Sequence, residues 1–291
     1  MIVGHHKIQK FLDKSIEKNA VAHAYIFSGP ENLGKFSLAL EFAKKLTGSN
    51  EEINPDIIII KPDIKENKGI FKEEEIKIEK IRDLQHQLSV TSYFGKCKVG
   101  IIDGADRMNK SSQNSLLKTL EEPADNIVLI LIVRDLNRIL PTIRSRCMQK
   151  RFSLVSEAEL SKIFFQDSKN RDEIIFWSLG RPGLAMKFLE NKTELLRRQE
   201  AEKELQKMIS SNVSDKMIFA EKAGKNSPEL LEKLSWWMVY FRENMLGGKK
   251  DIDLPPSRML KAIENIEKSI GTIRSTNSNA RLVLENLLLD F

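Results

Sequence analysis

Residues Ala24-Tyr-Ile-Phe-Ser-Gly-Pro-Glu-Asn-Leu-Gly-Lys35 join an apolar run to a glycine-containing loop that opens a helix. Ala24–Ser28 predicts a buried strand, and residues 36–46 have helical periodicity. The loop between them has the GxxxxGK spacing of a phosphate loop, in which backbone N–H groups and a helix N-terminus face phosphate oxygens. A strand, loop and helix in this order predict an α/β fold with a parallel sheet.

The same loop departs from the phosphate-binding pattern at one chemically important place. The residue after Lys35 is expected to be Ser or Thr, whose hydroxyl holds Mg²⁺, but it is Phe36. Ser37 follows one residue late, which on a helix is a turn of about 100° away from the site. Both retained nucleotide binding and an empty loop remain open. The candidate nucleotide contacts in this degenerate loop are Gly29, Pro30, Gly34 and Lys35.

A second candidate position follows the strand expected at 99–102. Asp103 stands at its end, where an aspartate beside a phosphate loop orients Mg²⁺ and its waters. An active ATPase of this type usually has a glutamate next, to polarise the attacking water, and here that residue is Gly104. We expect Asp106 to cap the following helix. The missing glutamate argues against hydrolysis by this chain alone.

The remaining elements alternate up to about residue 152 and are helical after it. Strands are expected at 56–60 and 127–133, and helices at 8–18, 74–88 and 111–122. Strands alternating with helices imply a parallel sheet covered on both faces. The helices expected after residue 152 cover 156–166, 171–179, 182–190, 193–210, 228–245, 255–270 and 279–289. We therefore predict an α/β domain at 1–152, a small helical domain at 153–192 and an all-helical domain at 193–291.

The composition indicates a globular protein rather than a membrane-spanning, disulfide-rich or metal-binding one. The 291 residues are 41% hydrophobic and 30% charged, with ample material for several cores. No apolar run approaches the ~20 residues that span a bilayer, and the first residues lack a signal-peptide pattern, so a cytoplasmic protein without membrane contact is expected. Cys97 and Cys147 have no CxxC partner, which argues against a disulfide or a metal site. The net charge of +6 leaves nucleic-acid binding open.

Several segments together carry a family resemblance. They are His23-Ala-Tyr-Ile-Phe-Ser-Gly-Pro30, Asn54-Pro-Asp56, Asp103-Gly-Ala-Asp106, Asn114-Ser-Leu-Leu-Lys-Thr-Leu-Glu-Glu-Pro123, Pro141-Thr-Ile-Arg-Ser-Arg-Cys147 and Asn279-Ala-Arg-Leu-Val-Leu-Glu-Asn-Leu-Leu-Leu289. In this order they resemble bacterial clamp-loader subunits of the AAA+ class, specifically the delta-prime family of DNA polymerase III. The resemblance covers essentially the whole chain.

The resemblance implies a AAA+ phosphate-loop domain, a helical lid and an all-α collar. It also implies a hetero-pentamer with delta and with gamma or tau subunits, within the DNA-directed DNA polymerase holoenzyme. That assembly opens the sliding clamp and places it on primed DNA. Arg146 matches the arginine finger of the family, a guanidinium that stabilises the transition state at a neighbouring subunit's nucleotide. Arg144 lacks that motif position.

The positions at which this sequence departs from the family pattern indicate which type of clamp-loader subunit it resembles. The zinc module with four cysteines that gamma-type and many delta-prime subunits carry is missing, so zinc is not expected. The two nucleotide-sensing positions align with Val133 or Arg134 and with Gly183. Counting Phe36 and Gly104, four catalytic positions are altered, which favours a non-hydrolysing subunit that needs no cofactor. The alternatives are an active gamma-type ATPase using Lys35 and Asp103, and a plain DNA-binding protein.

Overall fold

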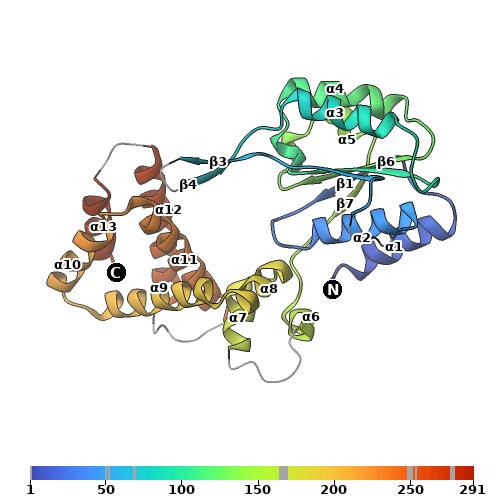
Figure 1. Cartoon of the computed structure of the whole chain (residues 1–291). Helices are drawn as coiled ribbons and strands as arrows, with labels where there is room; N and C mark the ends of the chain where they lie inside the picture. Colours follow the sequence, from blue (N-terminus) through green and yellow to red (C-terminus); the bar gives the residue numbers. More distant parts are fainter. Residues whose placement is uncertain are drawn as a thin grey trace. The chain divides into compact units, whose positions relative to one another are not determined.

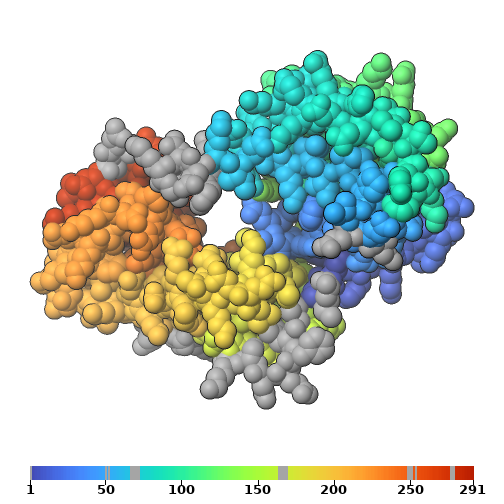
Figure 2. Space-filling view, in the orientation of Figure 1, coloured from blue at the N-terminus to red at the C-terminus, as the bar shows by residue number. Residues whose placement is uncertain are grey.

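The computed structural model describes residues 2–49, 51, 53–67, 70–163, 170–247, 252, 254–275 and 279–291. The chain divides into two compact units, residues 1–186 and 187–291, described separately below (Figure 1; space-filling view in Figure 2). No helix among the described residues is both long enough and apolar enough to cross a membrane.

The first unit is built on a five-stranded parallel sheet with the order β2-β5-β6-β1-β7. Its strands are β1 (Ala24–Ser28), β2 (Ile57–Ile60), β5 (Lys98–Asp103), β6 (Ile127–Val133) and β7 (Met148–Arg151). β1 and β6 pair with Ser28 opposite Val133, so their carboxyl ends lie level. β1, β5 and β6 are nearly continuous apolar runs, as strands covered on both faces require.

Helices cover both faces of this sheet (Figure 1). On one face, α1 (His6–Glu17) and α2 (Lys35–Thr47) pack against Tyr25 and Phe27 of β1. On the other face, α3 (Ile78–Ser89), α4 (Lys110–Glu121) and α5 (Pro141–Arg144) pack against Ala24 and Ile26. Alternate residues of β1 thus serve two separate cores, which is the geometry of a pleated strand.

The rest of the first unit consists of short elements. β3 (Ile64–Asn67) and β4 (Ile70–Glu73) form an antiparallel hairpin between β2 and α3. Two 3₁₀ turns, Ala105–Arg107 and Leu136–Arg138, follow β5 and β6. After β7 come α6 (Glu157–Leu160), a 3₁₀ turn at Ser161–Ile163 and α7 (Arg171–Ser178). α8 (Pro182–Glu190) runs across the boundary between the two units.

The second unit is entirely helical in its described residues. It contains α9 (Lys192–Ser210), α10 (Val213–Ala223), α11 (Ser227–Met245), α12 (Pro256–Ser275) and α13 (Ala280–Leu289). Its core forms around Trp237 of α11, which is fully buried, lies 5.9 Å from the ring of Phe219 and donates a 2.8 Å hydrogen bond to the carbonyl of Ala201. Trp236 is also buried, at 8% exposed.

Glycine and asparagine mark the ends of the main helices. Gly34 and Gly48 flank α2 with φ of 81° and 72°, conformations that favour glycine. Asparagine side chains accept a backbone N–H at the start of five helices and so satisfy donors that lack a partner within the helix. These residues are Asn109, Asn191, Asn212, Asn226 and Asn279.

The strands and helices expected up to residue 133 are confirmed within a few residues, with one exception. The helix expected at 74–88 begins only at Ile78, because β4 continues to Glu73 and Ile76 bridges to Met108. The sequence did not predict the β3–β4 hairpin, β7 or α10. Residues 164–166 of the helix expected at 156–166 lie outside the described residues. The three domain boundaries at 1–152, 153–192 and 193–291 remain a prediction.

Candidate functional site

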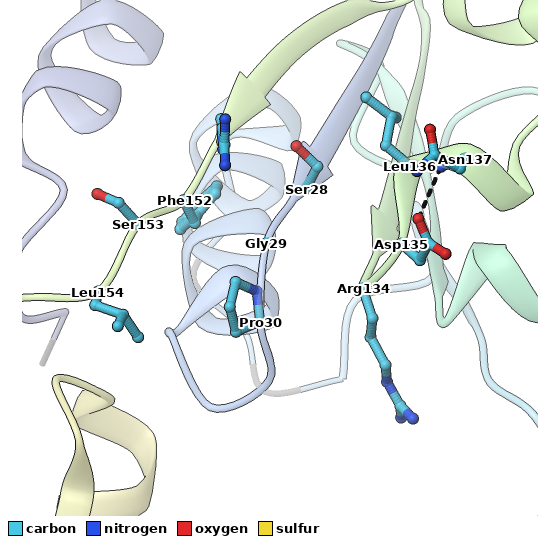
Figure 3. Close-up of a pocket in the computed structure, with 11 residues that line it drawn as sticks. Ser28, Gly29, Pro30, Arg134, Asp135, Leu136, Asn137, Phe152, Ser153 and Leu154 are labelled. Carbon is cyan, nitrogen blue, oxygen red and sulfur yellow. Dashed lines mark hydrogen bonds between the residues drawn. The ribbon is translucent and has the colours of Figure 1, made fainter. Parts of the chain in front are cut away.

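The glycine loop after β1 is tightly folded against neighbouring strands (Figure 3). Gly29 has φ of 143° and donates a hydrogen bond to the carbonyl of Val133 at 3.2 Å. A Cβ on Gly29 would fall 2.4 Å from the carbonyl oxygen of Phe152, so only glycine fits. Asn32 and Gly34 also have positive φ, at 60° and 81°. The loop therefore curls as the phosphate-loop spacing predicts.

Lys35 lies inside this curled loop and binds the loop itself. Its side chain is buried, with the residue 6% exposed, and its ammonium donates hydrogen bonds to the carbonyls of Gly29 and Pro30. Burial lowers the pKa of Lys35 to about 8, although the negative charges of Asp103 and Glu31 oppose that shift. Lys35 and Asp103 are thus brought into electrostatic reach of each other, as expected for residues of one nucleotide site.

The lowered pKa predicts how Lys35 affects stability. The folded-state pKa of about 8 lies below the ordinary 10.5, so the native state binds fewer protons than the unfolded state between these pH values. The free energy of unfolding of the wild type, relative to Lys35→Met, is therefore expected to rise with pH from 8 to 10.5. Urea unfolding at several pH values measures this difference. Lys18→Met, just after α1, controls for the lost charge, and a pH-independent difference for Lys35 would contradict the assignment.

The Mg²⁺-binding position of the pattern holds an aromatic ring. The ammonium of Lys61 lies 4.1 Å from the centre of the Phe36 ring, and Ser37 is exposed on the first turn of α2. A phenyl ring offers no oxygen to a hard cation. The first turn of α2 therefore lacks the hydroxyl that the sequence pattern requires at position 36.

The acidic strand end is shaped around Gly104. Burial raises the pKa of the Asp103 carboxyl, against the opposing effect of Lys61, Lys35 and Arg134. Gly104 has φ of 78°, and a Cβ there would lie 3.1 Å from Cγ of Pro62. A glutamate side chain at position 104 would therefore strain the backbone. The backbone at the end of β5 is adapted to glycine.

The expectation that Asp106 caps the next helix is wrong. Asn109 caps α4 by accepting from the N–H of Ser112 at 2.9 Å, while the buried Asp106 accepts from the N–H of Arg134 at 3.1 Å. The reason is the 3₁₀ turn after β5, which places Asp106 beside the end of β6 and leaves the cap to a residue three positions later.

Arg134, at one of the two sensing positions, is the centre of an ion-pair network that sequence reasoning missed. Its guanidinium contacts Glu31 of the loop at 2.7 Å and Glu73 at the end of β4 at 2.8 Å. Glu73 also binds Arg107 at 2.6 Å. These contacts join the loop, the β3–β4 hairpin and the ends of β5 and β6. They place two of the chain's own carboxylates against the arginine that stands where a nucleotide-sensing side chain is expected.

Gly183, at the second sensing position, meets the backbone of the loop directly. Its N–H donates to the carbonyl of Asn32 at 2.8 Å, and a Cβ on Gly183 would lie 2.9 Å from that same oxygen. An arginine at this place would need the loop to shift. The start of α8 therefore packs directly against the loop, and the contact depends on glycine at position 183.

The open space at this edge of the sheet lies beside the loop. A cavity of about 790 Å³ is found at the carboxyl ends of β1, β6 and β7 (Figure 3). Neither Lys35 nor Asp103 is among its lining residues. The residues that line it are Ser28, Gly29, Pro30, Arg134, Asp135, Leu136, Asn137, Arg151, Phe152, Ser153 and Leu154.

Arg146 lies on a different group of elements. Its Nη2 contacts Oε1 of Glu121 at the end of α4 at 2.9 Å, and its Nη1 donates to the carbonyl of Thr142 in α5 at 3.0 Å. The side chain is 37% exposed, whereas the next residue, Cys147, is buried in the core. The structure therefore brings Lys35 and Asp103 together but gives Arg146 contacts with α4 and α5 instead.

The two cysteines are separate free thiols. Burial raises the pKa of Cys147 to about 12, and burial together with Asp56 raises the pKa of Cys97 to about 11. Within the described ranges, no group of three or more His, Cys, Asp or Glu side chains has the arrangement of a metal site.

Comparison with known proteins identifies the family. Residues 4–156 match the family model described as "DNA polymerase III, delta subunit", and this match covers more than half of the 291 residues. The chain belongs to this family. The resemblance to the delta-prime family noted from the sequence motifs is thereby confirmed.

Curated relatives of the family agree with this assignment. The delta' subunit of DNA polymerase III from Pseudomonas aeruginosa is 34% identical over 146 residues, covering 44% of this chain and 42% of that protein. The delta' subunit from Bacillus subtilis is 36% identical over 157 residues, covering 48% and 45%. Subunits named gamma or tau also match, at 28–31% identity. The matches cover about half the length of the delta' and gamma relatives and 24–29% of the length of the tau relatives.

A solved structure supports the fold over the whole chain. The gamma subunit-related protein of DNA polymerase III from Thermotoga maritima superposes with a TM-score of 0.54 at 19% identity, covering 97% of this chain and 96% of that one. The expected fold class is confirmed: a parallel-sheet domain with helices around it, followed by a C-terminal helical region.

Proposed function

We propose that this member of the delta-subunit family is a delta-prime-type clamp-loader subunit that hydrolyses no nucleotide and lends Arg146 to the ATP site of a neighbouring subunit. The observation that carries the proposal is the separation of two functions in one chain. Arg146 presents a partly exposed guanidinium on α4 and α5, while the chain's own loop binds its own lysine. The arginine proposed to act on a neighbouring subunit is kept, whereas this chain's own nucleotide site is altered.

The residues around the loop do not fit a bound Mg²⁺–nucleotide. Phe36 replaces the hydroxyl ligand, Gly104 cannot polarise a water, and the ammonium of Lys35 is already engaged by loop carbonyls. We therefore assign no step of hydrolysis to this chain and propose that it needs no nucleotide and no zinc. Its proposed partners are delta and gamma or tau subunits, in a hetero-pentamer that places the sliding clamp on primed DNA in the cytoplasm.

An active gamma-type ATPase is the second candidate. It is favoured by the opposite charges of Lys35 and Asp103, which lie within electrostatic reach of each other, and by the similarity to gamma and tau subunits. The two candidates differ in what the isolated chain does with ATP. They do not differ in fold, so a kinetic measurement is needed.

The isolated chain is expected to release phosphate from ATP no faster than a reaction without protein, with or without DNA. A continuous phosphate-release assay on the purified wild type and on Lys35→Ala measures this. Any release that survives the Lys35→Ala substitution comes from a contaminating enzyme, because Lys35 holds the lysine position that contacts the outer phosphates in the phosphate-loop pattern. Turnover above background that disappears with Lys35→Ala would establish the gamma-type alternative and refute the proposal.

A further inference from the structure

The contacts of Arg146 single out Glu121 at the end of α4. One carboxylate oxygen of Glu121 lies 2.9 Å from Nη2, while the other terminal nitrogen, Nη1, donates to the carbonyl of Thr142 at 3.0 Å. The guanidinium is therefore held at two points, by one side chain and one backbone carbonyl from two different helices. Two anchors on a planar group fix its orientation better than one.

Both anchors belong to elements that are fixed in the same core. Leu120, next to Glu121, is 2% exposed, and Ile143, next to Thr142, is fully buried. Cys147, next to Arg146, is 8% exposed and lies in the same cluster. The carboxylate, the carbonyl and the arginine backbone thus share one rigid support, which is what a precisely placed functional group requires.

The held guanidinium keeps donors for a ligand. An arginine side chain has five N–H donors: the hydrogen bond to Thr142 uses one on Nη1, and we count one on Nη2 for the ion pair with Glu121. Three donors remain, enough for paired hydrogen bonds to phosphate oxygens. Arg146 can therefore bind a phosphate without leaving Glu121.

The exposure of the Arg146–Glu121 ion pair indicates that it contributes little to folding stability. The side chain of Glu121 is 49% exposed and that of Arg146 is 37% exposed. Ion pairs at such exposure contribute little to the free energy of unfolding, because water and salt screen them. Stability alone gives little reason for this contact.

We propose that Glu121 is a positioning residue, which holds the guanidinium of Arg146 in the orientation that meets a neighbouring subunit's triphosphate. The proposal rests on the proposed function of Arg146 and adds the residue through which its orientation is set. A competing role is that Glu121 keeps Arg146 away from phosphate. The two roles predict opposite signs when the charge of Glu121 is removed.

The test uses the clamp loader reconstituted with its partner subunits. Glu121→Gln is expected to lower kcat of the clamp- and DNA-stimulated ATPase by about 10- to 100-fold, the cost of a displaced catalytic group, with KM for ATP little changed. Glu122→Gln is the matched control, because it removes the same charge from the same helix end, one residue away. It is expected to leave kcat unchanged. Glu121→Asp should recover only part of the rate, since its shorter side chain displaces the carboxylate.

A second pair of variants shows whether Glu121 acts through Arg146. In the Arg146→Ala background, adding Glu121→Gln is expected to change kcat no further. Complex mass and thermal midpoint confirm that each variant assembles. An equal loss in both backgrounds, a rate like that of Glu122→Gln, or an increased rate for Glu121→Gln would each overturn the positioning role. An unchanged rate for Arg146→Ala itself would instead refute the proposed function.

Discussion

Replacing Arg146 with alanine is expected to abolish stimulated ATP hydrolysis at the neighbouring site while the clamp loader still assembles. A finger supplied in trans neutralises charge on the transferred phosphoryl group and is worth roughly 10³ to 10⁵ in rate. We expect turnover at that site to fall by at least about 10³-fold. Assembly should survive because the side chain is 37% exposed and its loss leaves no buried charge unpaired.

The measurement is steady-state phosphate release by the reconstituted complex, with and without clamp and primed DNA. Arg144→Ala is the matched control, because it removes the same charge two residues away, at the end of α5. Sites that use other fingers would continue to turn over, so single-turnover assays of the adjacent site are the sharper readout. A properly assembled Arg146→Ala complex with an unchanged rate at that site would show that Arg146 does not act in trans.

Replacing Trp237 with alanine is expected to have the largest effect on stability. The residue is fully buried in α11, its ring is stacked on Phe219, and its indole N–H donates to the carbonyl of Ala201. Truncation of a buried tryptophan costs about 3–5 kcal/mol, through lost contacts and the cavity left behind. That is a large share of the stability of a typical domain. Urea unfolding followed by circular dichroism measures the change.

Trp237→Phe separates packing from hydrogen bonding. It keeps an aromatic ring against Phe219 but removes the indole donor, so its cost should be clearly smaller than that of the alanine variant. The two compact units need not unfold together, so the transition that shifts should be the one assigned to residues 187–291. A loss below about 1 kcal/mol for Trp237→Ala would contradict the packing described around α11.

The sheet was predictable because its central strands carry unambiguous signals. Ala24–Ser28, Lys98–Asp103 and Ile127–Val133 are apolar runs with charged or glycine-containing segments around them, and such runs suit a strand with helices on both faces. The curled loop and the start of α2 were likewise readable, since glycines at 29 and 34 mark positions with positive φ.

The missed elements lack such signals. β7, with the sequence Met-Gln-Lys-Arg, lies at the edge of the sheet and is stabilised by pairing with β1 rather than by apolar side chains. The β3–β4 hairpin is rich in lysine and glutamate and lacks an apolar run like those of the central strands. In both cases contacts with a distant strand or a partner strand override local preference.

The candidate site was predictable as a set of altered positions but not as a network. Phe36, Gly104 and Gly183 could be recognised by comparison with the expected pattern. The ion pairs of Arg134 could not: Glu73 belongs to a hairpin that no local signal predicts, and Glu31 is about 100 residues from Arg134 in the sequence. Charged side chains far apart in sequence pair only after the backbone has brought them together.

The two native thiols have a practical consequence for following Arg146 in solution. Since burial raises the pKa of Cys97 to about 11 and that of Cys147 to about 12, we expect maleimides and other thiolate-selective reagents to attack them slowly at neutral pH. A cysteine introduced at the exposed Ser145 would therefore be the preferred attachment point for a fluorophore, with no need to remove the native sulfhydryls. A dye at that position would report on the environment of the adjoining guanidinium as the subunits come together.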